Sequence, residues 1–283
     1  MVTLVTGATG SAGEHVLRQL IEAGEQVRST VRPGLVPDPR TSHQTVVFDF
    51  ADQATYAAAL DGVDRVFLMR PPAISDVKRY LRPFIRAAAD RDMRQVVFLS
   101  LMGVNRVMPH WQVERDLHDS RVPHTLVRPA FFTQNLSVAY RDDVRVNDRI
   151  RLPAGSGRTS FIDTRDVAAV IVLALRDPES HAGNAYTITG ARAWSYSEVA
   201  AMLSAELGRA VRYETVGFLR YRKELLAEGL PTAYVRVQLL INAVARLGLA
   251  AKTNGTFRQL TGRSPITLPE SIHFLRDAWR RDP

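Results

Sequence analysis

The order of apolar and polar positions predicts alternating strands and helices up to residue 130. Short β-branched runs at Val2–Thr6 and Gln26–Val31 flank a segment, Glu14–Ala23, whose apolar residues recur at helical spacing. Such alternation is typical of an α/β protein whose parallel sheet is covered by helices on both faces. Further strands are expected at Thr45–Phe48, Arg65–Met69, Gln95–Leu99 and His124–Val127, and further helices at Gln53–Leu60, Asp76–Arg91 and His110–Ser120.

The pattern changes after residue 130. A helix at Asp166–Leu175 and a strand at Ala185–Thr189 still fit the alternation, and a capping box formed by Ser195 and Glu198 starts another helix. Residues 217–250 are expected to be helical, and a loop and a last helix follow. The chain thus predicts a doubly wound domain in residues 1–133, to which segments 157–176 and 184–190 return. Residues 134–283 are expected to form mainly a smaller lobe that covers the substrate.

Composition narrows the classes of partner. The net charge is +8, but only three of the 37 basic residues are lysines, and the arginines are scattered along the chain. Nucleic-acid binding is therefore not expected, because dedicated surfaces cluster their basic residues. No apolar run approaches the roughly 20 residues that cross a bilayer, and the first residues do not resemble a signal peptide. The absence of cysteine excludes disulfides and thiolate chemistry and favours a reducing, cytoplasmic location.

A glycine-rich turn follows the first expected strand. The segment "VTLVTGATGSAGEHVLRQL" places Gly7, Gly10 and Gly13 between that strand and the first helix. Glycines there permit a tight turn and let backbone N–H groups approach a pyrophosphate, and the helix N-terminus adds partial positive charge. The position of the motif predicts a Rossmann-type dinucleotide site.

Two residues at later strand ends bear on the choice of dinucleotide. Arg32 ends the second strand, where an acidic residue would favour NAD(H) and an arginine can receive the extra phosphate of NADP(H). NADP(H) is therefore the preferred cofactor, with NAD(H) as the alternative, unless Arg32 is merely solvated. Asp49 is open to two interpretations, a hydrogen bond to the adenine amino group or a cap for the following helix.

His110 and Glu114 share one face of an expected helix because they lie four residues apart. This spacing suits an acid–base pair, half of a metal site or ordinary helix chemistry. No second histidine lies at ligand spacing and the chain holds no thiolate, so no metal is expected.

Several motifs together resemble the NmrA-like branch of atypical short-chain dehydrogenases. They are "TGATGSAG", "VVFDFADQATYAAALDGVDRVFL", "VVFLSLMGV", "PHWQVERDLHDSRVPHTLVRPAFFTQN" and "RTSFIDTRDVAAVIVLAL", within residues 1–210. The resemblance implies an NAD(P)H-binding protein similar to quinone reductases, triphenylmethane reductase and reductases of ergot alkaloid assembly. The branch also includes regulators that bind NADP without known turnover.

The usual Tyr-x-x-x-Lys pair of short-chain dehydrogenases is absent. Aligned on the Lys-x-x-x-Glu frame of extended members, "HWQVE" puts His110 in the lysine position and Arg106 in the tyrosine position, where arginine is a poor proton donor. This departure favours an acceptor that spreads the developing charge or needs no proton, such as a quinone, an enone, an imine or an iminium. The alternative is a non-catalytic NADP(H) sensor, and the missing pair disfavours an epimerase-like enzyme.

The expected site is then as follows. His110 and Ser100 are the candidate catalytic residues, although His110 could instead bond locally at the helix start, and Glu114 is interpreted as structural rather than as a base. The loop 101–109 is a candidate lid. A small aromatic or conjugated molecule is the expected partner of a monomer or homodimer. Expected cofactor contacts are Gly7, Thr9, Gly10, Ser11, Ala12, Gly13, Arg32, Asp49, Phe50, Met69, Arg70, Pro71, Ser100, His110, Pro129 and Phe131, and expected substrate contacts are Phe131, Phe132, Asn135 and Met102.

Overall fold

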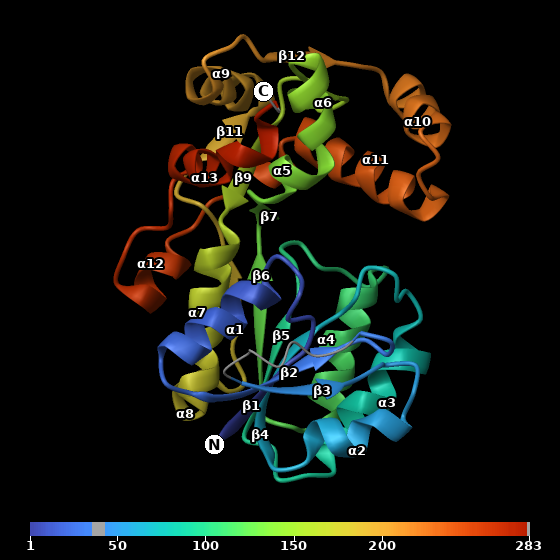
Figure 1. Ribbon diagram of the computed structural model, residues 1–283, viewed down its shortest axis with the longest axis vertical. Coiled ribbons are helices and arrows are strands. Elements are labelled where there is room, and N and C mark those ends of the chain that lie inside the picture. Colours follow the sequence, from blue (N-terminus) through green and yellow to red (C-terminus); the bar gives the residue numbers. More distant parts are fainter. Residues whose placement is uncertain (36–42, 282–283) are drawn as a thin grey trace. The chain divides into compact units, whose positions relative to one another are not determined.

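Two units make up the structure, a computed structural model that describes residues 1–35 and 43–281 (Figure 1). Unit 1 comprises residues 1–129 and 164–188, and unit 2 comprises residues 130–163 and 189–283. The sequence had placed the first boundary at 133 and had returned 157–176 to the first domain. In the structure, residues 157–163 instead lie in unit 2, because a strand there pairs within that unit.

Unit 1 contains a parallel sheet in which the order of seven strands is β10-β6-β5-β4-β1-β2-β3. This is the doubly wound order, in which the chain moves outward from β1 in one direction and then restarts on its other side at β4. Val66, Phe67 and Leu68 of strand β4 are fully buried, as expected of an apolar run in a sheet covered on both faces. The strands are β1 (Val2–Val5), β2 (Gln26–Val31), β3 (Gln44–Val47), β4 (Val63–Met69), β5 (Gln95–Leu99), β6 (His124–Pro129) and β10 (Ala185–Ile188).

Helices cover both faces of this sheet (Figure 1). Helices α1 and α7 pack together on one face, while α2, α3 and α4 form a layer on the other. The second layer encloses a buried cluster that includes Leu4, Val66, Phe84, Phe98 and Leu117. The helices are α1 (Gly13–Glu22), α2 (Ala54–Leu60), α3 (Val77–Ala89), α4 (Pro109–Ser120), α7 (Thr164–Arg176) and α8 (Pro178–His181).

Unit 2 holds two small sheets around its own buried core. In the first, β9 pairs with β7 in parallel and with β11 in antiparallel orientation. In the second, β8 and β12 form a parallel pair. The strands are β7 (Phe131–Phe132), β8 (Arg149–Leu152), β9 (Arg158–Ile162), β11 (Ala193–Ser195) and β12 (Arg212–Thr215).

The helices of unit 2 include the one that the capping box predicted. Ser195 Oγ accepts from the Glu198 N–H at 3.2 Å and Glu198 Oε2 accepts from the Ser195 N–H at 2.8 Å, which confirms that box. The backbone hydrogen bond from Ser195 is the main cause that lowers the pKa of Glu198 to about 2. The α-helices are α5 (Asn135–Ala139), α6 (Arg141–Asn147), α9 (Tyr196–Leu207), α10 (Phe218–Ala227), α11 (Thr232–Arg246), α12 (Thr256–Thr261) and α13 (Leu268–Leu275), and the short 3-10 helices are η1 (Leu249–Ala251) and η2 (Arg276–Trp279).

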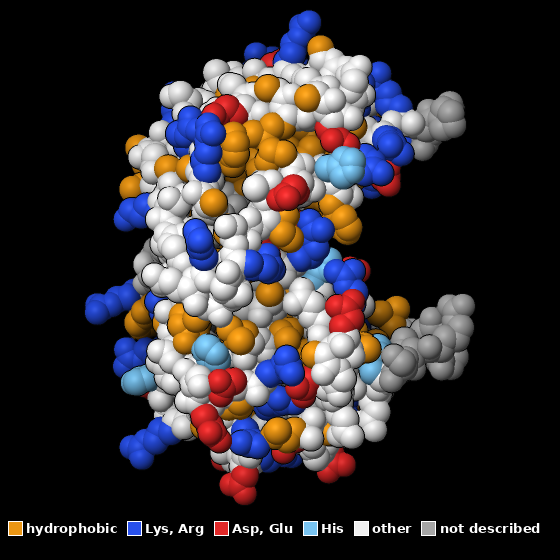
Figure 2. All heavy atoms as spheres, turned by 90° about the vertical axis from the view of Figure 1, so that its left-hand side faces the viewer, with side chains coloured by type: hydrophobic (Ala, Val, Ile, Leu, Met, Phe, Trp, Pro, Cys, Tyr) orange, Lys and Arg blue, Asp and Glu red, His pale blue; other side chains and the backbone are white. Residues whose placement is uncertain are grey.

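The surface charges are mixed rather than gathered. On the face drawn in Figure 2, basic side chains lie among acidic and apolar ones and form no continuous patch. Within residues 1–35 and 43–281, no single helix is long and apolar enough to span a membrane, although the bent pair Thr232–Arg246 and Leu249–Thr261 passes by length and composition alone. In the same residues, no three His, Asp or Glu side chains are grouped to hold a metal ion.

Candidate functional site in unit 1

The expected cofactor residues of unit 1 gather at one edge of the sheet, where the carboxyl ends of its parallel strands meet. The glycine turn follows β1, Arg32 follows β2, Asp49 follows β3, and Met69 ends β4. Strands β1 and β4 are neighbours and mark the point at which the winding direction changes. Ligands of doubly wound sheets bind in the crevice outside such a point.

The glycine turn is too tightly packed for side chains. Gly7 has φ +63°, in the left-handed region, and a Cβ there would strike the Met69 side chain. A Cβ at Gly13 would fall on the Gly7 carbonyl oxygen and lie 2.8 Å from the Gly7 carbonyl carbon. The Gly10 N–H donates to that same oxygen at 2.9 Å, which closes the turn. Glycine is therefore favoured at position 7 by the left-handed backbone and required at position 13 because a Cβ would meet backbone atoms.

The start of α1 leaves donors for an anion. Ala12 occupies the N-cap and, among the described residues, no side chain caps this helix end. The first N–H groups of a helix have no intrahelical acceptor and carry partial positive charge, although here the Glu14 N–H donates to the Gly10 carbonyl oxygen at 2.9 Å. Thr9 and Ser11 are exposed beside the turn. These features fit the pyrophosphate of a dinucleotide, because the helix N-terminus follows a turn that is packed too tightly for side chains.

The residues expected to face the adenosine lie at the ends of β2 and β3. Arg32 is exposed directly after β2. Asp49 Oδ1 accepts from the Ala51 N–H at 2.8 Å, whereas the N-cap of α2 is Gln53. The interpretation of Asp49 as a cap of the next helix is therefore wrong, because its carboxylate shapes the preceding turn. The adenine contact stays a prediction. The Phe50 ring packs in the core at 4.7 Å from the Phe48 ring centre, so its backbone is the part left for a cofactor contact.

Replacing Arg32 tests the preference for NADP(H). We expect Arg32→Glu to weaken NADPH binding by about 10-fold or more, or about 1.4 kcal/mol, because a carboxylate would repel the extra phosphate. NADH lacks this phosphate, and its dissociation constant should change little. Fluorescence titration of both cofactors measures the two effects, and equal weakening of NADPH and NADH would contradict the assignment.

Arg70 brings a fixed cation to the edge beside Met69 and Pro71. Its Nη1 atom donates to the carbonyl oxygens of Pro71 at 3.0 Å and Pro72 at 3.3 Å, and also to that of Ile74. The Nε atom of Arg70 is buried and meets no acceptor among the described residues. A buried donor without a partner is rare in folded proteins, and at this edge it fits an oxygen of a bound cofactor. The sequence predicted that Arg70 lies at the cofactor edge, but not that burial and the Arg70 charge together lower the pKa of His110.

Ser100, Glu114 and Arg128 form a buried network beside this edge. The Ser100 hydroxyl donates to Glu114 Oε1 at 2.6 Å, and the Arg128 guanidinium binds both oxygens of the same carboxylate, with Nε 2.8 Å from Oε1. Hydrogen bonding to Glu114 is the main cause that raises the pKa of Arg128. Glu114 is thus a structural anchor, as interpreted from the sequence. Arg128 was missed, although a lone arginine in the apolar strand "HTLVRP" signals a buried acidic partner.

His110 lies in the first turn of α4, which Pro109 begins. Its ring centre is 6.2 Å from that of Phe98. Burial, and secondarily the positive charge of Arg70, lower the pKa of His110 to about 4. The imidazole is therefore neutral at physiological pH. It can exchange hydrogen bonds with a ribose or substrate hydroxyl, but it does not supply the positive charge of the lysine whose position the sequence motif predicts for it.

The lowered pKa of His110 makes stability depend on pH. Because the unfolded chain binds a proton near pH 6.5 and the folded chain only near pH 4, the neutral ring's contribution is present above pH 6.5 and is lost as the pH falls toward 4. Between pH 6.5 and pH 4 we expect the free energy of unfolding to fall by up to about 3 kcal/mol because of His110. The His110→Gln protein should lack this part of the loss. Urea unfolding of both proteins at several pH values measures it, and an imidazole NMR titration midpoint above pH 6 would contradict the assignment.

The remaining expected residues divide between the units. In unit 1, the Met102 N–H donates to the Pro129 carbonyl at 2.9 Å, which joins the start of the 101–109 loop to β6. In unit 2, Phe131 packs edge-on against Phe161 with ring centres 5.6 Å apart. Phe132 and Asn135 are half-buried there. Their roles toward a cofactor or a substrate stay predictions.

Comparisons with known proteins agree with this architecture. The model of the NmrA-like family matches residues 2–252. An NAD(P)H azoreductase of Xenophilus azovorans is 33% identical over 94% of this chain and 95% of its own length. A (4-alkanoyl-5-oxo-2,5-dihydrofuran-3-yl)methyl phosphate reductase of Streptomyces griseus is 34% identical over 92% of this chain and 93% of its own length.

Among solved structures, the NADPH-dependent quinone oxidoreductase of Escherichia coli in complex with NADPH is similar in fold. Its TM-score is 0.85 at 24% identity, and the match covers 98% of this chain and all of that one. The comparisons confirm the predicted Rossmann-type fold, the oxidoreductase class and the nicotinamide cofactor. The chain belongs to the NmrA-like family.

Proposed function

We propose that this protein is an NADPH-dependent reductase that transfers hydride to a small conjugated acceptor, such as a quinone, an enone or an imine. The general class agrees with two relatives, an NAD(P)H azoreductase and a phosphate-ester reductase. One of them is a reductase of an unsaturated dihydrofuran derivative. A cytoplasmic location and a monomeric or homodimeric state, both expected from the sequence, belong to the same proposal.

The proposal rests on the lack of an effective proton donor at the position of the usual tyrosine. Arg106 takes the tyrosine position and is exposed in the loop before α4. His110 stays neutral because its pKa is about 4, and the Ser100 proton is directed to Glu114. Reduction of a simple ketone creates a strongly basic alkoxide, whereas a quinone or enone delocalises the charge that it gains. Acceptors of the second kind therefore suit the residues present.

The chain's own residues have distinct tasks in this proposal. The glycine turn and the start of α1 bind the pyrophosphate, and Arg32 binds the extra phosphate. NADPH, when bound, supplies the hydride. Arg70 keeps a positive charge at the end of β4, close enough to lower the pKa of His110. Such a charge stabilises an acceptor that becomes anionic and disfavours one that is already cationic. Neutral quinones and enones are thus preferred over iminium ions.

An acceptor panel tests the proposal. Purified protein is mixed with NADPH and, in separate reactions, a quinone, an enone, an iminium salt, an azo dye and a simple aliphatic ketone, while the absorbance of the reduced nicotinamide is followed. We expect quinone and enone to be reduced at least about 10-fold faster than the ketone, which is about 1.4 kcal/mol in barrier. Gly13→Ala protein serves as the control for direct chemical oxidation.

Two outcomes would contradict the proposal. Reduction of the ketone as fast as the quinone would show that an effective proton donor exists. Tight NADPH binding without oxidation by any acceptor would instead favour the second candidate, a non-catalytic NADP(H) sensor. Ser100 and Glu114 are both engaged in structural hydrogen bonds. For this reason the sensor is kept as the second candidate.

A further inference from the structure

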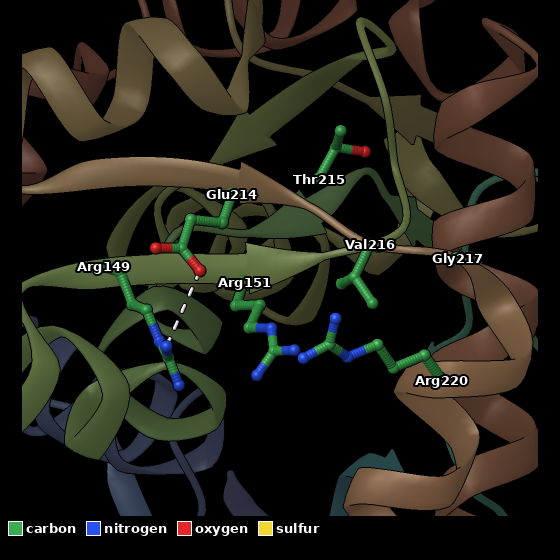
Figure 3. A pocket seen from close by; sticks show the side chains of 7 residues that line it. All are labelled: Arg149, Arg151, Glu214, Thr215, Val216, Gly217 and Arg220. Carbon is green, nitrogen blue, oxygen red and sulfur yellow. Dashed lines mark ion pairs between the residues drawn. The ribbon is translucent and has the colours of Figure 1, made fainter.

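Unit 2 carries a polar pocket of about 330 Å³ beside the strand pair β8–β12. None of its lining residues belongs to the candidate cofactor site of unit 1. Ile150 and Leu152 of β8 are fully buried in the core of unit 2, so the alternating positions 149 and 151 face the other side. Figure 3 shows side chains from β8, β12 and α10 converging on this space. The lining residues are Arg149, Arg151, Glu214, Thr215, Val216, Gly217 and Arg220.

The lining contains three arginines and one glutamate, and two further carboxylates, Asp143 and Glu224, form ion pairs with these arginines. Arg149 is already satisfied, because its Nε lies 3.0 Å from Asp143 and its Nη1 lies 3.6 Å from Glu214. Arg151 and Arg220 differ, because both donate to a single atom, Glu224 Oε1, at 2.7 and 3.0 Å. Two guanidinium groups therefore share one carboxylate oxygen.

The two shared guanidinium groups face each other. In Figure 3 the tips of Arg151 and Arg220 point toward one another across the pocket. The Arg151 side chain is only 17% exposed, so water screens its charge poorly, whereas Arg220 is 72% exposed. Like charges in this arrangement repel, and Glu224 sets one negative charge against two positive ones, which leaves an excess that an anion bound to the remaining N–H groups would neutralise.

The N-terminus of α10 also favours an anion in this pocket. Gly217 is its N-cap, and within the described residues no side chain caps this end and no acidic residue lies in the first turn. The first intrahelical bond runs from the Tyr221 N–H to the Gly217 carbonyl at 3.0 Å, so earlier N–H groups have no helical acceptor. Arg220 adds a positive charge where the helix dipole favours a negative one. Thr215 supplies a hydroxyl on the same wall.

We propose that this pocket binds a phosphate-type oxyanion, either free inorganic phosphate or the phosphate group of a small phosphomonoester. The anion would accept from Arg151, Arg220 and the first N–H groups of α10. Arginine forks match the geometry of phosphate oxygens, and the pocket is larger than a phosphate ion, which leaves space for a short organic chain. This site lies wholly in unit 2, and the proposal does not depend on the proposed reductase activity.

Calorimetric titration of the full-length protein tests the site. The protein is first saturated with NADP+, so that the glycine turn of unit 1 is occupied, and inorganic phosphate is then added at low ionic strength. We expect saturable binding at one site. The Arg151→Ala/Arg220→Ala protein should bind at least about 10-fold more weakly, which corresponds to about 1.4 kcal/mol. Glycerol 3-phosphate, titrated in parallel, reports whether an ester binds more tightly than the free ion.

Matched variants keep the result interpretable. Arg222→Ala removes an exposed arginine of the same helix that does not line the pocket, and it should bind phosphate like the wild type. Arg220→Gln alone removes a mostly exposed side chain, and it should weaken binding even if the double variant is unstable. The proposal is overturned by absent saturable binding, by equal losses in Arg222→Ala and the double variant, or by acetate binding as tightly as phosphate.

Discussion

Gly13→Ala is expected to weaken NADPH binding by about 100-fold or more, which corresponds to about 2.8 kcal/mol. The added Cβ would fall on the Gly7 carbonyl oxygen, so either the turn or the start of α1 must move. Either movement displaces the backbone N–H groups that are placed to bind the pyrophosphate. Equilibrium titration of NADPH fluorescence measures the loss, and circular dichroism with thermal unfolding establishes that the variant is folded.

A graded series separates steric obstruction from general damage. At Gly10 a Cβ would lie 3.3 Å from the Gly7 carbonyl oxygen, a tight but less severe contact, so Gly10→Ala should bind NADPH with intermediate affinity. Gly255, at the start of α12 in unit 2, has open space, since a Cβ would find only Gln259 Nε2 at 4.0 Å. Gly255→Ala should therefore leave the affinity unchanged. A folded Gly13→Ala protein with wild-type affinity would remove the glycine turn from the cofactor site.

Glu114→Ala is expected to lower the free energy of unfolding by about 3 kcal/mol. The substitution leaves the partly buried Arg128 guanidinium without its carboxylate and the Ser100 hydroxyl without its acceptor. An uncompensated charge below the surface costs more than the ion pair itself contributes. Glu114→Gln keeps the shape and one acceptor oxygen, so it should be less destabilising. Urea unfolding at neutral pH measures both variants.

The same helix offers the control for this prediction. Asp119 pairs with Arg115 at 3.5 Å, but both side chains are more than half exposed. Asp119→Asn should therefore change the free energy of unfolding by less than about 1 kcal/mol, because water and salt screen such pairs. Equal losses in Asp119→Asn and Glu114→Ala would show that the network around Ser100 is not a structural anchor.

Agreement between sequence and structure is closest where local patterns are strong. Strands Gln26–Val31 and Gln95–Leu99 agree at both ends, because β-branched residues mark the first and an unbroken apolar run marks the second. The Ser195–Glu198 box marked the start of α9 because its hydrogen bonds span only three residues. The strands of unit 2 were not predicted. Segments such as Arg149–Leu152 are short and half polar, and long-range pairing rather than local pattern makes them strands.

The sequence by itself determined the doubly wound sheet, the glycine turn and the family. The reason is that these features depend on residue spacing along one stretch of chain. Only the tertiary structure decided the surroundings of His110 and Glu114. Glu114 is held by Arg128 from β6, and His110 is kept neutral by burial and by Arg70, which directly follows β4. Charges and burial contributed by neighbouring strands set the protonation of a side chain, and four-residue spacing on a helix carries no information about either.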